Sequence, residues 1–191
     1  KMFRGGFFPG GVLQTSALSA VDIALWDLKG KALGVPVYEL LGGRTRDKVV
    51  CYPHNGGPGI DGLVESCRKT AGEGWKFVRW GLSDADSEEG FEPTRAVRYG
   101  IEQVEAVRDA LGDDVEILVD VHTRLDPADS IAFCNGVSQF RPFFIEDPIR
   151  SENAESLKLL RAQSSVPLAI GEQYASKWEF REVVENDLMD Y

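Results

Sequence analysis

Three acidic residues, Asp120, Glu146 and Glu172, each end a short apolar stretch that reads as a β-strand. The first and second acids are 26 positions apart, and so are the second and third. That interval is about the length of one strand plus one helix, so each acid occupies the same place in three successive units. If the units form a parallel barrel, the carboxyl ends of its strands surround one mouth, and the three carboxylates converge there.

Converging carboxylates indicate a divalent cation, because like charges repel strongly where the dielectric is low and a hard cation with oxygen ligands neutralises them. Mg2+ is the expected ion, since it keeps water or substrate oxygens in its remaining octahedral positions. The alternative is that the acids cap helices or pair with lysines. That alternative is ordinary for one acid and less expected for three acids at one repeat position.

Two residues just beyond Asp120 are candidates for the reaction itself. His122 is two positions further on, and strand side chains alternate between faces, so we expect it to face the same side as Asp120. A histidine beside a metal site can act as general acid or base near neutral pH. Arg124 can bind a substrate carboxylate or hydroxyl. The competing interpretations are a polar histidine at the rim and an arginine that pairs with an acid.

His54 and Arg79 are further candidates on the two preceding strands. His54 ends the first expected strand and precedes Gly56 and Gly57, which let backbone approach a ligand closely. It can line the pocket, or it can be a loop histidine bonded to backbone. Arg79 lies on a short apolar strand, where a guanidinium needs an anion unless it is exposed. We expect Arg79 to have a role in the site.

The elements that must position these residues follow a regular alternation. Apolar residues recur at three- and four-residue steps over 15–32, which predicts an amphipathic helix. Short apolar runs then alternate with helical patterns. The expected strands are 49–52, 77–80, 115–121, 143–146 and 168–172, with 188–191 beginning a sixth; the helices between them are 60–71, 94–111, 127–139, 153–162 and 177–186.

This alternation predicts an α/β fold with parallel strands, either a doubly wound sheet or a (β/α)8 TIM-type barrel. No Gly-x-Gly-x-x-Gly motif follows the first expected strand, which favours the barrel. A closed barrel needs eight strands and about 250 residues, so we expect this chain to be part of a longer one. Residues 1–46 are expected to be the linker helix segment, and 47–191 the barrel's strands 1 to 5 and the start of strand 6. The polar stretch 83–92 is expected to be a loop at the site or surface.

The composition is typical of an ordinary globular protein, with 43% hydrophobic and 27% charged residues. The net charge of −10 disfavours nucleic acid and anionic membranes as partners. No apolar run is long enough for a transmembrane span, and residues 1–11 do not have the pattern of a targeting sequence. Three cysteines outside any CxxC pattern argue against a disulfide framework or zinc site, so we expect a cytoplasmic protein.

The chain resembles the mandelate racemase branch of the enolase superfamily, especially its acid-sugar dehydratases. The segment 19–31, SAVDIALWDLKGK, is similar to the helix that links the family's capping domain to its barrel. Asp120-Val121-His122, Glu146-Asp147-Pro148 and Gly171-Glu172 are similar to the ligand motifs of strands three, four and five. The resemblance implies that Asp120, Glu146 and Glu172 bind Mg2+ and that His122 is the acid that expels a β-hydroxyl. We also expect the full-length protein to form a homo-oligomer.

Two departures from the family, and one position outside this sequence, bear on the reaction. The racemases carry Lys-x-Lys on strand two, where this chain has Arg79-Trp80-Gly81, so that lysine base is absent. Arg79 matches an arginine of mannonate dehydratases, but no tyrosine stands where those enzymes carry its partner. Galactonate dehydratases use a histidine on strand seven as base, which would lie beyond Tyr191.

The resemblance therefore implies dehydration of a sugar acid. A base takes the proton next to the carboxylate, Mg2+ stabilises the resulting charge, and His122 donates a proton to the leaving 3-hydroxyl. The product is a 2-keto-3-deoxy sugar acid. Alternatives are a racemase or epimerase, a metal-dependent aldolase on the same barrel, and a non-catalytic homologue that binds sugar acids.

Overall fold

The computed structural model describes residue 7 and residues 10–84 and 90–191. The chain divides into two compact units, Lys1–Val50 with Tyr174–Glu179 and Cys51–Gln173 with Phe180–Tyr191. The expected loop 83–92 and the segment 1–11 lie partly outside the described residues. The domain boundary expected at residue 46 stays a prediction.

The first unit contains the helices α1 (Gly11–Leu33) and α2 (Val37–Leu40). Helix α1 confirms the helix predicted over 15–32 and begins four residues earlier. Its expected apolar stripe is not buried, since Val21, Leu25 and Leu28 are exposed. It ends where Gly34 takes the left-handed conformation, at a φ of 69°. Among the described residues, no helix is both long and apolar enough to cross a membrane.

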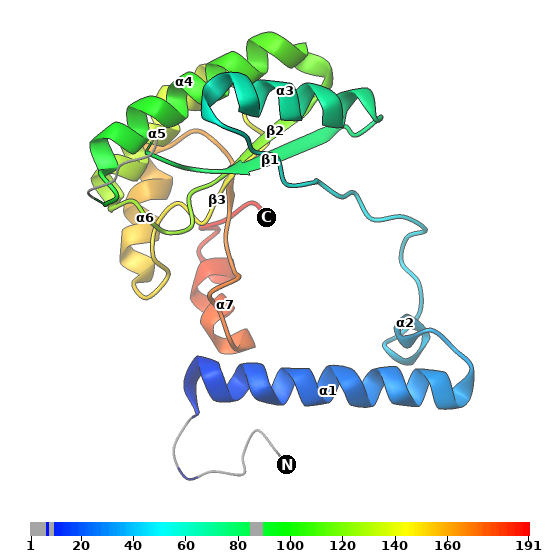
Figure 1. The fold of residues 1–191 in the computed structure, drawn as a ribbon. Coiled ribbons are helices and arrows are strands. Elements are labelled where there is room, and N and C mark those ends of the chain that lie inside the picture. Colours follow the sequence, from blue (N-terminus) through cyan, green and yellow to red (C-terminus); the bar gives the residue numbers. More distant parts are fainter. Residues whose placement is uncertain (1–6, 8–9, 85–89) are drawn as a thin grey trace. The chain divides into compact units, whose positions relative to one another are not determined.

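The second unit alternates strands and helices along the chain (Figure 1). Its elements are α3 (Gly59–Gly72), β1 (Phe77–Gly81), α4 (Pro93–Leu111), η2 (Gly112–Asp114), β2 (Glu116–Asp120), α5 (Pro127–Val137), η3 (Ser138–Phe140), β3 (Phe144–Glu146), α6 (Ala154–Gln163) and β4 (Leu168–Ala169). Helix α7 (Lys177–Glu185) contributes residues to both units. The predicted helices after each strand are confirmed within one or two residues at each end.

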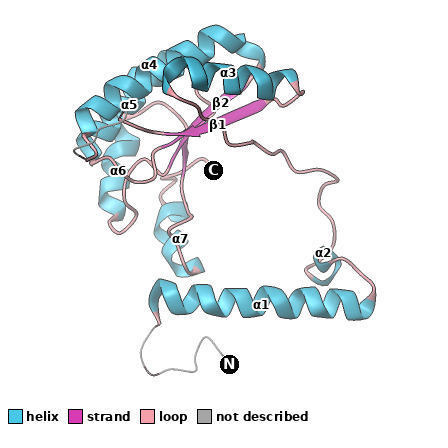
Figure 2. Cartoon of the chain, in the orientation of Figure 1, coloured by secondary structure: helices cyan, strands magenta, loops and turns pink. Residues whose placement is uncertain are grey.

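The four strands form one parallel sheet in the order β1-β2-β3-β4. Helices α3, α4, α5 and α6 contact one another in the same order, and they cover one face of the sheet (Figure 2). A doubly wound sheet reverses its strand order at a switch point, and a barrel does not. The observed order is that of a barrel segment.

Side chains alternate between the two faces of each strand, as strand geometry requires. Val78 and Trp80 on β1 are buried in the core, together with Ile117 and Val119 on β2. Arg79 and Gly81 lie on the opposite face of β1. The polar residues that form the site therefore come from the face turned away from this core.

The two expected strands at the edges of the sheet have different outcomes. Residues 49–52 form no strand, and the chain pairs with β1 slightly later, at His54. The expected start of a strand at 188–191 pairs with β4 at its last residue. At the β1 edge, His54 forms a parallel bridge to Arg79: Asn55 N donates to Arg79 O at 2.7 Å, and Arg79 N donates to Pro53 O at 3.3 Å. Pro53 has no N–H to donate, which limits pairing there. At the other edge, Tyr191 N donates to Leu168 O at 3.1 Å and Ile170 N donates to Tyr191 O at 3.3 Å, which is the pattern of a parallel strand pair.

Candidate active site

The sheet register brings two of the predicted acids together. Asp120 pairs with Gly81 on one side and Glu146 on the other, so the two carboxylates leave neighbouring strand ends on the same face. The Asp120 side chain is 0% exposed and that of Glu146 is 18% exposed. This pair is the part of the predicted site that the sheet itself assembles.

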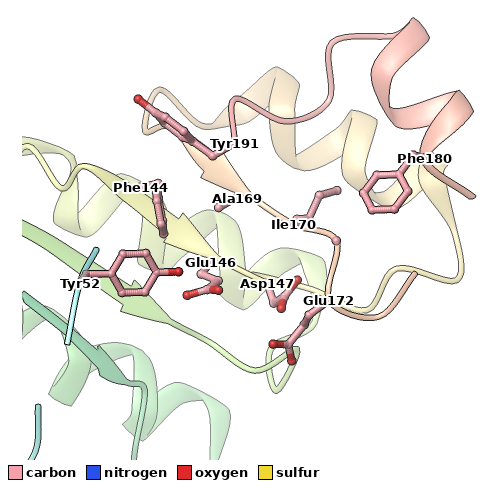
Figure 3. Close-up of a pocket in the computed structure, with 10 residues that line it drawn as sticks. Tyr52, Phe144, Glu146, Asp147, Ala169, Ile170, Glu172, Phe180 and Tyr191 are labelled. Atoms are coloured by element: carbon pink, nitrogen blue, oxygen red, sulfur yellow. The ribbon is translucent and has the colours of Figure 1, made fainter. Parts of the chain in front are cut away.

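Glu172 reaches the same region from a loop rather than from a strand. Strand β4 ends at Ala169, and Gly171 takes a φ of 139°, a conformation that favours glycine. Glu146, Asp147 and Glu172 line a cavity of about 520 Å³. Their three carboxylates lie near one another (Figure 3). Tyr52 lies next to Glu146 in this view, and its hydroxyl points toward that carboxylate (Figure 3). The expected strand 168–172 is therefore shorter than predicted, while Glu172 lines the same cavity as Glu146.

The pKa of the Asp147 carboxyl reflects burial and the negative charge on this side of the cavity. Asp147 is buried, and burial raises the pKa of its carboxyl to about 6, with the charges of Glu172 and Glu146 adding to the increase. Nearby anions disfavour another negative charge. The cavity is therefore a place where positive charge is stabilised.

Arg79 supplies positive charge directly between two of the predicted ligands. Its Nη2 contacts Asp120 Oδ2, and its Nε lies 3.3 Å from Glu146 Oε2. Nη1 lies 2.6 Å from Nδ1 of His54. The prediction that this guanidinium finds an anion is confirmed, because it contacts both carboxylates at the strand ends.

The donor set suits magnesium. Asp120 Oδ2 is buried and has no partner with hydrogen-bond geometry, although Arg79 and His122 both lie against it. A buried carboxylate requires a compensating positive charge, which Arg79 supplies here and which a hard cation with oxygen ligands could also supply. Among the described residues, no three acidic, histidine or cysteine side chains converge closely enough to hold an ion as they stand. The ligand assignment of Asp120, Glu146 and Glu172 stays a prediction.

His122 faces Asp120, but strand alternation is not the cause. Strand β2 ends at Asp120, and His122 and Thr123 both take left-handed conformations, at φ values of 52° and 57°. The backbone N–H of His122 donates to Asp120 Oδ1 at 2.8 Å, and its Nε2 lies 2.9 Å from Asp120 Oδ2. This tight turn folds the imidazole back over the carboxylate, and left-handed residues outside glycine often mark functional sites.

His54, Arg124 and His122 line a second crevice. This crevice has a volume of about 250 Å³ and includes the backbone of Gly56 and Gly57. Burial lowers the pKa of His54, and the positive charge of Arg79 adds to the decrease. The Arg124 guanidinium lies over the Phe91 ring, 5.5 Å from its centre. The structure thus places both predicted binding residues beside His122.

Sequence reasoning did not single out Tyr52, Asp147 or Gln173 as site residues. Asp147 directly follows a predicted ligand, so its position was a usable signal. Tyr52 lies in the stretch where a strand was expected, and Gln173 makes its contacts with residues distant in the sequence. No local pattern marks either of them.

Comparisons with known proteins agree with this geometry. Residues 62–191 match the family model for an enolase C-terminal domain-like fold, and residues 2–42 match the mandelate racemase / muconate lactonizing enzyme N-terminal domain. The chain is 33% identical to a D-mannonate dehydratase of Caulobacter sp. (strain K31), over 99% of this chain and 52% of that protein. It is 38% identical to a D-galactonate dehydratase of Ralstonia nicotianae, over 96% and 48%.

A solved structure of similar form is that of an enolase from Pantoea ananatis with bound D-gluconate and magnesium. It is 32% identical, has a TM-score of 0.89, and is matched over 100% of this chain and 53% of its own length. The chain thus spans about half the length of the relatives it matches. The family matches, the TIM-barrel neighbours and the parallel sheet together show that this chain belongs to the mandelate racemase and muconate lactonizing enzyme branch of the enolase superfamily.

Proposed function

We propose that the protein is a magnesium-dependent dehydratase of sugar acids. The observation that carries the proposal is that His122 Nε2 lies 2.9 Å from Asp120 Oδ2. Asp120 in turn pairs with Glu146 at the carboxyl end of the neighbouring strand. A proton donor beside a cluster of oxygen ligands is the arrangement that elimination next to a carboxylate requires. Relatives named D-mannonate and D-galactonate dehydratases support the substrate class.

Asp120, Glu146 and Glu172 are assigned as the magnesium ligands. Their oxygens are the donors that Mg2+ prefers, and the carboxylates of Asp120 and Glu146 leave neighbouring strand ends on the same face. When bound, the ion stabilises the negative charge that develops on the substrate carboxylate as the neighbouring proton leaves. A solved relative carries magnesium together with D-gluconate, which supports this assignment.

Four residues of this chain, His122, Arg79, Arg124 and His54, are assigned to the rest of the reaction. The α-carbon loses its proton to a base, the bond between C3 and its hydroxyl breaks, and His122 donates the proton with which that hydroxyl leaves as water. The enol that remains becomes a 2-keto-3-deoxy acid. Arg79 acts in the same site, since it contacts both carboxylates and His54. Arg124 and His54 bind the substrate's polar groups from the crevice they share with His122.

We infer that the protein works in the cytoplasm and as a homo-oligomer. Cys51, Cys67 and Cys134 are all free thiols, which is typical of a reducing compartment. A small sugar acid is the proposed substrate, and the net charge of −10 disfavours nucleic acid and membrane surfaces as partners.

The test is an assay of the full-length protein with D-mannonate, D-galactonate and D-gluconate in the presence of Mg2+. We expect a 2-keto-3-deoxy acid from at least one sugar acid, loss of the activity with a chelator, and recovery when Mg2+ is restored. Three results would replace the proposal. Exchange or inversion at the α-carbon without keto acid indicates a racemase or epimerase, carbon–carbon cleavage indicates an aldolase, and binding without turnover indicates a binding protein.

A further inference from the structure

The side chain of Gln173 connects three loops at the carboxyl ends of the strands. Its Oε1 accepts hydrogen bonds from Ser151 Oγ at 2.7 Å and from Ser151 N at 3.2 Å. Its Nε2 donates to Thr123 Oγ1 at 3.4 Å. Thr123 lies in the loop after β2, Ser151 in the loop after β3, and Gln173 in the loop after β4. One amide therefore links the three loops that follow the candidate ligands.

The chemistry of the partners fixes which way this amide points. Ser151 N–H can only donate, so the atom that faces it must be the amide oxygen. The amide nitrogen then faces Thr123, whose hydroxyl oxygen can accept. The amide oxygen accepts two hydrogen bonds from Ser151, and the amide nitrogen donates one long hydrogen bond to Thr123. We therefore expect the interaction with Thr123 to be the weaker of the two.

Each end of the link adjoins a residue of the proposed site. Gln173 directly follows Glu172, and Thr123 directly follows His122. Thr123 N donates to Asp147 O at 2.8 Å, which ties the same turn to the loop after β3. His122 and Thr123 are both left-handed, a conformation that persists only where the surroundings hold it.

We propose that Gln173 is a positioning residue that holds the His122 turn in register with Glu172. This role rests on the proposed dehydratase function, since it concerns the residues assigned to that reaction. Gln173 acts through the loops and not on the substrate. Removing its amide should loosen the turn without removing any group that takes part in the chemistry.

Hydrogen exchange of the substrate-free, full-length protein tests the link independently of turnover. In Gln173→Met, which keeps the side-chain length, backbone amides of 121–125 and of Ser151 should exchange about 2- to 10-fold faster, the worth of one hydrogen bond. Thr123→Val removes only the weaker interaction, the hydrogen bond between Gln173 and Thr123. Hydrogen exchange of 121–125 should therefore become faster, and that of Ser151 should not change. Thr123→Ser keeps the hydroxyl and should restore protection. Gln163→Met, at the exposed end of α6, is the matched control and should change neither loop.

Kinetics then decide whether the link positions catalytic groups. We expect Gln173→Met to lower kcat more than it raises KM, and Thr123→Ser to keep a kcat nearer to wild type than Thr123→Val does. Unchanged exchange in Gln173→Met would overturn the link itself, and faster exchange with an unchanged kcat would overturn its positioning role. If no sugar acid is turned over by the wild type, the proposed function fails and the positioning role fails with it, while faster exchange in Gln173→Met would still show the link.

Discussion

A β-carbon on Gly81 would stand 3.2 Å from Cε1 of His122 and 3.5 Å from its Nδ1. The imidazole thus lies against the backbone of the strand on which the family's racemases carry their lysines. Gly81 occupies the second of those two lysine positions. The imidazole of His122 therefore occupies space that a side chain at position 81 would need.

Gly81→Ala should therefore disturb His122 without disturbing the strand. The added methyl group forces the ring to move by a few tenths of an ångström, so we expect kcat to fall about 10-fold, since small displacements of catalytic groups are costly. Steady-state kinetics on the preferred sugar acid measure this. Gly72→Ala is the control, because its β-carbon would meet nothing within 4 Å. A wild-type kcat in Gly81→Ala would show that this ring position is unimportant.

Arg79→Met should raise the affinity for Mg2+. The guanidinium contacts Asp120 and Glu146, so a cation that binds these carboxylates must displace or share it. Removing this competing charge should tighten Mg2+ binding about 10-fold, equivalent to roughly 1.4 kcal/mol. Isothermal titration of the metal-free protein gives the affinity. Arg124→Met loses the same charge from an arginine that lies over Phe91, and should change the affinity less. Unchanged or weaker binding in Arg79→Met would contradict the competition.

The strand-end acids illustrate what a sequence can predict here. Asp120 and Glu146 end hydrophobic strands one repeat apart, and parallel register then makes them neighbours, as expected. The orientation of His122 depends on two left-handed residues that no local residue preference demands. We expected strand alternation to turn His122 toward Asp120. The side chain does face Asp120, but this left-handed turn places it there. Gln173 contacts Thr123 across 50 positions, and only the folded loops bring such polar partners together.

Mg2+ should stabilise the wild type and not Asp120→Asn. A ligand that binds only the folded state stabilises it by about 2.7 kcal/mol at 100 times its Kd. We expect the wild-type melting temperature to rise with Mg2+, and this rise to disappear in Asp120→Asn. Asp113→Asn, which alters an exposed acid paired with Arg141, should keep the rise. An equal rise in Asp120→Asn would remove Asp120 from the ligand set.

The pairing of Arg161 with Asp190 should make stability depend on pH in the acid range. Hydrogen bonds from Arg161 hold the pKa of the Asp190 carboxyl below its usual value of 3.8. The unfolded chain therefore takes up this proton at a higher pH than the folded chain, so acid favours unfolding. Asp190→Asn should lower the unfolding free energy by its full amount above about pH 5. The difference from the wild type should become smaller as the pH falls below about 4. Urea unfolding across this range checks it, and a pH-independent difference would contradict it.

The most direct test of the account is the reaction of His122→Asn in heavy water, followed at two positions of the substrate. If His122 expels the hydroxyl, formation of the keto acid should fall about 10²- to 10⁴-fold, the usual worth of general acid catalysis. Exchange of the α-proton for deuterium should survive better, because a different group removes that proton. Mg2+ affinity should change little. An equal fall in exchange and dehydration would instead make His122 the base or a positioning group, and no fall in either would contradict the account.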